Sequence, residues 1–426
     1  MTRTLMVGFS EAFLRAVSPH VAPRSIVALE EPDVIRKRRL LEIACELPCL
    51  ADVVPAEYQQ SDAYFAAGLA ACTDHGLDAI LPGTEYGVPA AAALAEALGR
   101  PGAGVAAAAT LRDKLRLRST SAAAGVRNPE FRQVRGPDDI VTFAAGRPVV
   151  AKPADRQASV GVHRLHRVSR DEAATAWQAM RVATESKQVP DRPMTSRYLV
   201  ETLLHGPEYS VEVLVREGTI VFENVTEKEV ISGVHPVEAG HLLPAPLPAG
   251  ARAELRDATR RLVRATGFSS GIMHAEWILT DEGPALIECA GRCPGDRIVD
   301  LIDLAYGTNL RLALIDVLAG RFPRLPQRAT RSAAIRFLQP SPGTVTAVNG
   351  VDSARRAPGV HQLSVAVDVG CRVTRWRSSW DRPGYVIVTA ADGERAQKAA
   401  RWAAQAVQIG RASCRKECRS RWSPYH

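Results

Sequence analysis

The sequence has no long apolar run, since none of its apolar stretches reaches the roughly 18 residues that a membrane-spanning helix needs. A secretory leader is missing from the N-terminus as well. Residues 1–8 hold one arginine and a short apolar run, and the polar residues Ser10 and Glu11 follow directly. This pattern predicts a first β-strand and not a signal peptide. We therefore expect a protein with no membrane partner.

Cysteine motifs of the kind that hold zinc or perform redox chemistry are also absent. Three pairs among the eight cysteines have the spacing C-x-x-x-C, and no matching set of histidines accompanies them. Zinc ribbons and redox motifs use C-x-x-C instead. Reduced, non-ligating thiols are expected, and such thiols are typical of a cytoplasmic protein.

Glycine is sparse where a dinucleotide cofactor would need it. The turn Gly8-Phe9-Ser10 follows the first predicted strand, but it lacks the three glycines at fixed spacing that form a dinucleotide fingerprint. No internal repeat and no extended low-complexity tract is found. With 426 residues, 46% of them hydrophobic and 23% charged, the chain predicts a soluble globular protein of two or three domains.

Much of the basic charge lies at the C-terminus. Residues 409–426 contain five Lys or Arg and one Glu, so they carry half of the formal net charge of +8. The segment has no apolar period and resembles a translated sequencing adapter, so we expect a non-native tail. The alternative is a genuine basic tail with an acidic partner. A nucleic-acid-binding role would then depend on these residues.

The rest of the chain predicts an α/β and α+β protein in three parts. Residues 1–110 alternate strand-like and helix-like segments, as in a Rossmann-like domain with a parallel sheet. A basic helix, expected to start at Leu111 and to end before Gly125, opens the second part at residues 111–330. Residues 331–408 are rich in strand and turn signals and end in an alanine-rich helix.

The most informative stretch is a hairpin that carries two glutamates. Residues 275–279 and 284–288 predict two strands, joined by a three-residue loop with Gly283 where a positive φ is needed. In this register Thr280 opposes Pro284. Glu276 then lies directly opposite Glu288, and both carboxylates project from the same face.

Two like charges that face each other destabilise a sheet unless a cation lies between them. Mg²⁺ suits such a pair, because one or two carboxylates usually hold it while water and phosphate oxygens complete its octahedron. The pair therefore indicates a site for nucleotide phosphates. The alternative is a solvent-facing ribbon with two hydrated glutamates.

Two other segments carry polar residues of interest. A buried strand ends in Lys152 and opens into a small, polar turn, which offers backbone N–H groups to phosphate oxygens. Further along, polar and apolar residues alternate, so that Glu208, Ser210 and Glu212 share one face of a strand. This acidic face either lines a nucleotide cleft or is simply solvated.

Taken together, these motifs resemble the ATP-grasp superfamily of carboxylate–amine ligases, in order as well as in content. The motifs are Lys114, Lys152 with its Ser-Val-Gly loop, Glu201 followed by His205-Gly-Pro-Glu208, and the hairpin with Glu276, Glu288 and Arg292. The resemblance spans residues 1 to about 408. It implies a Rossmann-like domain at 1–110, an ATP-grasp fold of two α+β subdomains at 111–330, and a small strand-rich segment at 331–408.

The resemblance also implies roles for individual residues. The ATP phosphates would be bound by Lys114 and Lys152 under a flexible loop, 155–162, that contains Ser159 and Gly161. The adenine would meet Glu201, Thr202 and Leu203, and the ribose would meet Glu208. A metal ion, Mg²⁺ or Mn²⁺, would be held by Glu276 and Glu288. Arg292, next to the acyl group, and Lys152 would be the catalytic residues. Taken alone, each of these charges is equally typical of a solvated surface.

Two further residues are candidate substrate contacts. His274 shares a face with Glu276, and Glu85 lies at the C-terminal end of a strand, where open α/β sheets place ligands. A structural histidine and a helix-capping glutamate are the alternatives.

The sequence departs from the superfamily at one position. Many members have Asn two residues after the second Glu, as a further metal ligand, whereas this chain has Ala290. The pattern from Glu288 to Arg292 resembles the branch that joins L-amino acids into dipeptides. Coordination of a second metal ion would then depend more on water and phosphate oxygens.

The expected activity is an ATP-dependent ligation. A carboxylate, expected to be that of an amino acid, would take the γ-phosphoryl group of ATP and react as an acylphosphate with an amine, with release of ADP and phosphate. The expected partners are small-molecule carboxylate and amine substrates, with no nucleic acid, and a homodimer is an open alternative. Purine-pathway or biotin-carboxylase-type enzymes and a non-catalytic ATP-binding protein are the rival hypotheses.

Overall fold

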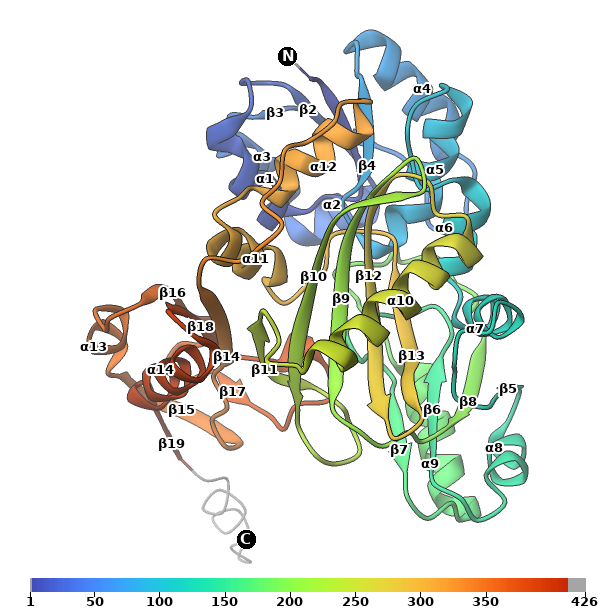
Figure 1. Ribbon diagram of the computed structural model, residues 1–426, viewed down its shortest axis with the longest axis vertical. Helices are drawn as coiled ribbons and strands as arrows, with labels where there is room; N and C mark the ends of the chain where they lie inside the picture. The colour runs from blue at the N-terminus through green and yellow to red at the C-terminus, as the bar shows by residue number, and fades with distance from the viewer. Residues whose placement is uncertain (1, 413–426) are drawn as a thin grey trace, which may run out of the picture.

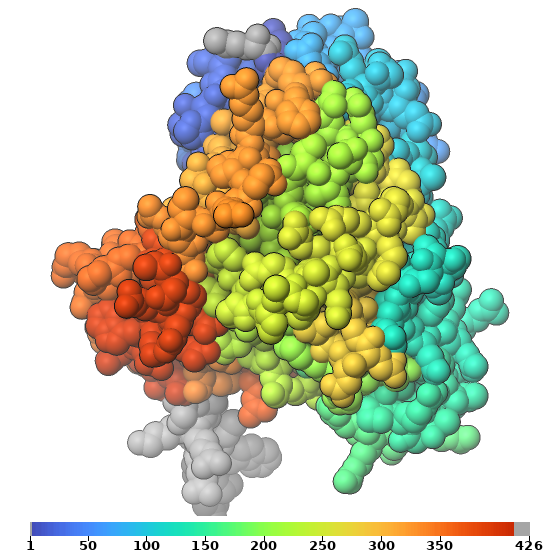
Figure 2. Space-filling model, viewed as in Figure 1, coloured from blue at the N-terminus to red at the C-terminus, as the bar shows by residue number. Residues whose placement is uncertain are grey.

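The computed structural model describes residues 2–412, which form three parts around one large central sheet (Figure 1). The same view as a solid surface shows the N-terminal part, in blue, packed directly on the orange helices of the C-terminal half (Figure 2). Within residues 2–412, every helix is too short or too polar to span a bilayer. The predicted α/β and α+β class is confirmed.

The N-terminal part is a parallel sheet with helices on its faces. Strands β1 and β2 are buried along their whole length. Such burial is expected, because helices cover both faces of a parallel sheet. The strand order is β3-β2-β1-β4. The elements are β1 (Thr4–Val7), β2 (Ile26–Glu30), β3 (Leu50–Pro55) and β4 (Ala79–Pro82), with α1 (Glu11–Val17), α2 (Pro32–Arg38), α3 (Leu40–Cys45), α4 (Tyr64–Asp74), η2 (Glu85–Gly87), α5 (Val88–Ala97) and α6 (Val105–Leu111).

A small subdomain follows, with an antiparallel sheet of order β5-β8-β6-β7. Its strands are β5 (Phe131–Val134), β6 (Val149–Pro153), β7 (His163–Leu165) and β8 (Tyr198–Thr202), and its helices are α7 (Lys114–Ala123), α8 (Pro137–Ala144) and α9 (Arg170–Val182). The predicted basic helix is present and ends before Gly125, but its predicted start at Leu111 is wrong, because α7 begins at Lys114. The chain breaks at Arg112, and Asp113 caps α7 by accepting hydrogen bonds from Leu115 N and Arg116 N, as an N-cap aspartate commonly does.

The central sheet has eight strands in the order β13-β12-β9-β10-β11-β14-β18-β16. Its strands are β9 (Glu208–Arg216), β10 (Thr219–Val230), β11 (Glu238–Leu243), β12 (Gly271–Thr280), β13 (Gly283–Ala290), β14 (Ser332–Phe337), β16 (Val360–Val365) and β18 (Gly384–Ala390). Helices α10 (Ala249–Thr266), α11 (Ile298–Tyr306), α12 (Leu310–Leu318) and α14 (Gly393–Ala406) pack on it. Three of these strands come from residues 331–408, so the C-terminal segment shares its largest sheet with the preceding part.

A small sheet of order β17-β15-β19 completes the C-terminal segment, with α13 (Val351–Arg355) beside it. Its strands are β15 (Gly343–Asn349), β17 (Arg372–Val373) and β19 (Gln408–Ala412). The first four residues of the predicted non-native tail therefore lie in a strand that pairs with β15. Residues 413–426 lie outside the described part, and the origin of the tail stays a prediction.

The two faces of β9 divide as their alternation predicts. Tyr209, Val211 and Val213 are buried in the core beneath α10. Glu208, Ser210 and Glu212 point to the opposite face, where they join a polar network. This division places the acidic face toward the small subdomain and not toward solvent.

Gly206, in the turn between β8 and β9, is a position that only glycine fits. Its φ is +145°, and a Cβ there would lie 2.2 Å from the carbonyl oxygen of Leu279. We expect Gly206→Ala to destabilise the protein by about 2 kcal/mol or more, because it adds a clash to a strained backbone. Urea denaturation should show a lower midpoint, whereas Gly250→Ala, where a Cβ would meet open space, should leave it nearly unchanged.

Candidate active site

A cleft of about 700 Å³ lies between the small subdomain and the central sheet. Aliphatic side chains of Val150, Leu204, Ile278 and Ile287 form part of its wall. Eight of the predicted site residues also line it: Lys152, Ser159, Glu201, Thr202, Leu203, Glu208, Glu276 and Glu288. Residues predicted from three separate stretches of sequence, 152–159, 201–208 and 276–288, thus meet around one cavity, apolar on some walls and charged on others.

The predicted pairing of Glu276 with Glu288 is confirmed, although the predicted loop is wrong. Thr280 pairs with Gly283 across a two-residue loop, one residue shorter than expected. A β-bulge between Glu276 and Trp277 leaves Ile287 as an extra residue on β13 and shifts the register by one. The bulge compensates for the shorter loop, so the two glutamates still lie opposite each other.

Two lysines compensate the two carboxylates. Lys228 Nζ lies 2.5 Å from Glu276 Oε1, and Lys114 Nζ lies 2.9 Å from Glu288 Oε1. The repulsion that the sequence pattern implies is therefore already relieved by the protein itself. A metal ion is therefore not needed to relieve this repulsion, and it would be held here by the oxygen donors of Glu276 and Glu288. Within residues 2–412, no cluster of three or more His, Cys, Asp or Glu side chains forms a complete metal-binding set.

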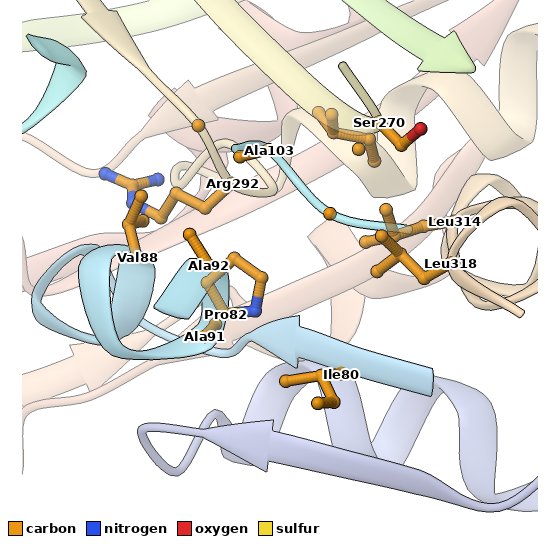
Figure 3. A pocket seen from close by; sticks show the side chains of 14 residues that line it. Ile80, Pro82, Val88, Ala91, Ala92, Ala103, Ser270, Arg292, Leu314 and Leu318 are labelled. Atoms are coloured by element: carbon orange, nitrogen blue, oxygen red, sulfur yellow. The ribbon is translucent and has the colours of Figure 1, made fainter. Parts of the chain in front are cut away.

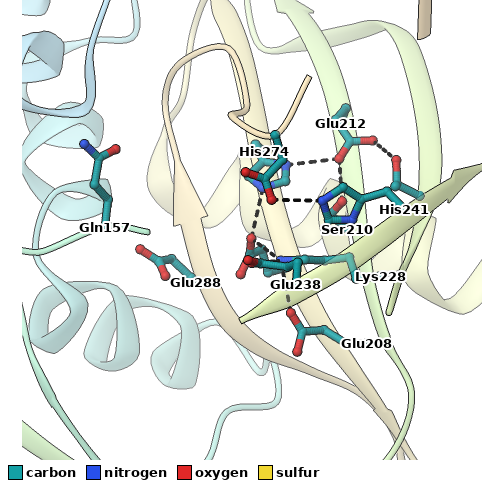
Figure 4. Close-up of polar contacts among 12 residues, drawn as sticks. Gln157, Glu208, Ser210, Glu212, Lys228, Glu238, His241, His274 and Glu288 are labelled. Carbon is teal, nitrogen blue, oxygen red and sulfur yellow. Dashed lines mark hydrogen bonds and ion pairs between the residues drawn. The ribbon is translucent and has the colours of Figure 1, made fainter. Parts of the chain in front are cut away.

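Lys228 lies at the centre of an acidic cluster. Besides Glu276, its Nζ contacts Glu208 Oε1 at 3.0 Å and Glu238 Oε1 at 3.3 Å, and its side chain is 2% exposed. Burial alone would lower the pKa of Lys228, but the three carboxylates raise it well above its ordinary value. The ammonium therefore stays charged and holds three acidic side chains from β9, β11 and β12 together (Figure 4).

His274 connects this cluster to a further carboxylate, the fully buried Glu212. Its Nδ1 lies 3.0 Å from Glu212 Oε1, and its Nε2 lies 3.1 Å from Glu276 Oε1. Burial lowers the pKa of His274, but both carboxylates act against it and raise the value to about 9. The ring then carries both protons at neutral pH and donates to both glutamates (Figure 4). Glu212 also accepts hydrogen bonds from Ser210 and Thr226, so the orientation of His274 is fixed.

Lys152 is held by Glu201 at the base of the cleft. Lys152 Nζ lies 2.7 Å from Glu201 Oε2, and Arg118 Nε lies 2.8 Å from Glu201 Oε1. Burial alone would raise the pKa of Glu201, but Arg118 and Lys152 lower it below its ordinary value. Both oxygens of Glu201 are thus occupied, and its carboxylate orients Lys152. Its neighbours Thr202 and Leu203 line the cleft directly.

The loop after β6 closes one side of the cleft. Ser159 and Gly161 both adopt positive φ angles there, +59° and +74°. Ser159 Oγ donates to the carbonyl oxygen of Pro236 at 2.7 Å, and Lys114 Nζ donates to that of Arg156 at 2.6 Å. These contacts hold the loop against the turn that precedes β11 and against Lys114 of α7.

Two candidate substrate residues that are far apart in sequence form one ion pair. Arg292 Nε lies 2.7 Å from Glu85 Oε2, and Arg112 Nη1 lies 2.9 Å from Glu85 Oε1. Burial alone would raise the pKa of Glu85, but Arg292 and Arg112 lower it below its ordinary value. Glu85 is therefore an ionised carboxylate held between two guanidinium groups, one on each of its oxygens.

A second, smaller cavity lies behind Arg292 (Figure 3). Its walls come mainly from small and aliphatic residues such as Ala92, Ala103 and Leu314. Arg292 is the one charged residue of the described chain that lines it. This cavity does not suit a nucleotide, which needs several cations or N–H donors for its phosphates.

Sequence reasoning missed four residues of the site: Lys228, Glu238, Arg118 and Arg112. Two of them carried a usable signal. Lys228 follows Asn224 and Thr226 at period two, which places it on the polar face of β10, opposite Glu208. Arg118 lies four residues after Lys114, on the same face of α7. For Glu238 and Arg112 the signal is tertiary, because their partners come from other elements.

Comparison with known proteins agrees with this geometry. Residues 145–300 match the ATP-grasp domain, and residues 336–410 match the L-amino acid ligase C-terminal domain 2. The crystal structure of an L-amino acid ligase from Bacillus licheniformis superposes with a TM-score of 0.77 at 18% identity, covering 97% of this chain and 99% of that one. At this identity the likeness shows a shared fold.

Curated relatives match over part of their length. An uncharacterized protein of Sinorhizobium fredii, y4rH, is 30% identical over 281 residues, which are 65% of this chain and 56% of that protein. The alanine–anticapsin ligase of Bacillus subtilis is 26% identical over 269 residues, 59% of this chain and 56% of that enzyme. The chain thus spans about half the length of these two relatives.

The domain match at residues 145–300, the shared fold and the cleft agree with an ATP-grasp domain in this part of the chain. More particularly, the second match, at residues 336–410, is to the C-terminal domain 2 of L-amino acid ligases. The predicted resemblance to that branch is confirmed.

Proposed function

We propose that this protein is an ATP-dependent carboxylate–amine ligase that acts on an amino acid. The observation that carries the proposal is the convergence of Lys152, Glu276 and Glu288 on one cleft, beside the ion pair of Arg292 with Glu85. The lysine and the two glutamates suit a nucleoside triphosphate with its metal ion. The ion pair suits a zwitterionic substrate. A C-terminal domain of the L-amino acid ligase type supports the same reading.

The nucleotide would occupy the large cleft. Val150 and Ile287 offer apolar surface for adenine next to Thr202 and Leu203, and Glu208 offers a carboxylate to the ribose hydroxyls. Lys114 and Lys152 supply cations for the phosphates, beneath the loop that holds Ser159 and Gly161. In this arrangement Glu201 acts on the phosphates indirectly, because it orients Lys152.

The donor set of the cleft fits a hard divalent ion. Glu276 and Glu288 face the same cavity, and Mg²⁺ is commonly held by one or two carboxylates with phosphate and water oxygens in its other positions. Lys228 and His274 keep Glu276 ionised and oriented, as an oxygen ligand requires. Bound there, Mg²⁺ or Mn²⁺ would neutralise charge on the phosphates during transfer.

Arg292 and Glu85 are the proposed substrate contacts. A guanidinium binds a carboxylate in plane, and an ionised Glu85 attracts an ammonium group. Together they suit an α-amino acid. The substrate carboxylate would attack the γ-phosphorus, the bond from the γ-phosphorus to the bridging oxygen would break, and ADP would leave. The amine would then attack the acyl carbon of the acylphosphate, and the amide would form with loss of phosphate. Positioning and charge neutralisation provide most of the catalysis.

The reaction would take place in the cytoplasm. The six cysteines among residues 2–412 are all free thiols, and such thiols are typical of a reducing compartment. Small-molecule carboxylate and amine substrates are the proposed partners.

A phosphate-release screen tests the proposal. Purified protein is incubated with ATP and Mg²⁺ and with single amino acids or amino acid pairs. We expect phosphate release that requires an amino acid and yields one amide per ADP, as detected by mass spectrometry. Release that depends on bicarbonate would instead favour a carboxylase-type enzyme. ATP binding without ADP formation for any carboxylate would favour a non-catalytic protein.

A further inference from the structure

One side chain connects the loop over the phosphates to the proposed substrate site. The amide oxygen of Gln157 accepts a hydrogen bond from Arg292 Nη2 at 3.0 Å, and its amide nitrogen donates to Glu185 Oε1 at 3.2 Å. Gln157 belongs to the loop after β6, on the same side of the acidic cluster as Glu288 (Figure 4). The loop thus reaches past the large cleft to Arg292, the proposed contact of the carboxylate substrate.

The other partner of Gln157 is a fixed anchor. Glu185 is buried and accepts a hydrogen bond from the hydroxyl group of Tyr86, which follows Glu85 in η2. The segment after Glu185 is tied to the N-terminal domain, because Arg192 Nη1 pairs with the fully buried Glu31 at 2.7 Å. Val189 lies in the core of the same domain. Gln157 therefore connects a loop to a rigid point beside the substrate pair.

The neutral amide of Gln157 satisfies both of its charged partners at once. It must accept from a guanidinium and donate to a carboxylate, and an amide group offers one acceptor and two donor hydrogens. Arg292 uses two more of its donors on Glu85 and on the carbonyl oxygen of Cys293. A guanidinium has five N–H donors, so these contacts leave two of them for a substrate carboxylate.

We propose that Gln157 is a positioning residue that orients Arg292 for the carboxylate substrate and couples substrate binding to closure of the loop over ATP. The inference rests on the proposed ligase function. If a bound substrate holds Arg292 in one orientation, it also strengthens the hydrogen bond from Arg292 to Gln157, which holds the loop closed. The coupling is reciprocal, because two binding events that share one closed state must favour each other equally. Closure also keeps water from the acylphosphate.

The first test is Gln157→Ala, compared with Gln60→Ala as a matched control. Gln60 belongs to the N-terminal domain and forms hydrogen bonds with Thr195, in the segment after Glu185. Within the described residues it forms no hydrogen bond with Arg292, so its replacement leaves the contact between Gln157 and Arg292 intact. In Gln157→Ala we expect the KM for the carboxylate substrate to rise about 10- to 100-fold, the effect of losing a hydrogen bond to a charged group. The affinity for ATP without the carboxylate substrate should change less than threefold, whereas the mutual strengthening of ATP and carboxylate binding should be lost in both directions. Gln60→Ala should match the wild type in both constants.

A second readout measures leakage of the intermediate. If the loop opens while the acylphosphate is present, water competes with the amine, and more ADP is released than amide is formed. We expect the ratio of ADP to amide to be close to one in the wild type and in Gln60→Ala, and at least twofold higher in Gln157→Ala. A residue with only a structural role would lower the rate without changing this ratio.

Gln157→Glu separates positioning from space filling. The new carboxylate has the shape of glutamine but would pair with Arg292 itself and repel Glu185. We expect a larger rise in the carboxylate KM than in Gln157→Ala, whereas a packing role predicts a smaller one. Melting temperatures of all variants should lie close together, and a variant that unfolds at the assay temperature would mark Gln157 as a structural residue.

The outcomes separate this inference from the ligase function. If wild-type protein forms no amide from any amino acid pair, the proposed function fails and the inference fails with it. If wild-type protein is active with the best pair of the screen, while both Gln157 variants keep its carboxylate KM and its ratio of ADP to amide, the inference alone is wrong.

Discussion

Replacing Glu288 by glutamine is expected to lower ATP-dependent phosphate release by about 100- to 1000-fold, the loss found when one preorganised electrostatic group is removed from a transition state. The amide keeps the size of the side chain and can still accept a hydrogen bond from Lys114. It removes the charge that would hold a divalent ion beside the phosphates. The Mg²⁺ concentration that gives half the maximal rate should rise as well.

The matched control for this experiment lies on the same hairpin. Glu282, in the loop between β12 and β13, is exposed and pairs with Arg127. Glu282→Gln makes the same chemical change but should keep full activity, because exposed ion pairs contribute little. Neither substitution should shift the melting temperature by more than a few degrees. Full activity of Glu288→Gln would contradict the proposed metal site.

The hairpin shows what the sequence could and could not predict. The alternation of residues and the position of Gly283 were enough to place Glu276 opposite Glu288. The length of the loop could not be predicted in the same way. A two-residue loop with a bulge and a three-residue loop without one both pair Glu276 with Glu288. Bulges depend on the local fit of backbone and side chains and leave little trace in a single sequence.

Charge partners were harder to predict than positions. The sequence indicated that the two glutamates needed a cation, but not that Lys114 from α7 and Lys228 from β10 supply it. Such pairings depend on how separate elements pack. Likewise, Glu85 was selected for its place at the end of a strand and Arg292 through the family resemblance. Their direct contact appears only when the N-terminal domain packs on the central sheet.

The second large effect is expected at Lys228. Lys228→Met would leave Glu208, Glu238 and Glu276 facing one another without their shared cation. Removing one partner of a buried ion pair costs about 3–5 kcal/mol, because the remaining charge is left uncompensated. Here three carboxylates are affected, so we expect a loss at the upper end of this range. Urea denaturation of the variant and the wild type measures it.

The pH dependence of this loss gives a sharper test of its cause. Lys228 keeps the pKa of Glu276 far below its ordinary value, although burial alone would raise it. In Lys228→Met the pKa values of the three carboxylates should rise in the folded state, so the folded variant binds protons more tightly than the unfolded chain. The difference in free energy of unfolding between wild type and variant should therefore become smaller as the pH falls from 7 toward 5. Lys398→Met removes an exposed lysine that pairs with Glu394 and should change stability by less than about 0.5 kcal/mol at either pH. A gap that stays constant with pH would show that Lys228 stabilises the fold through packing and not through its charge.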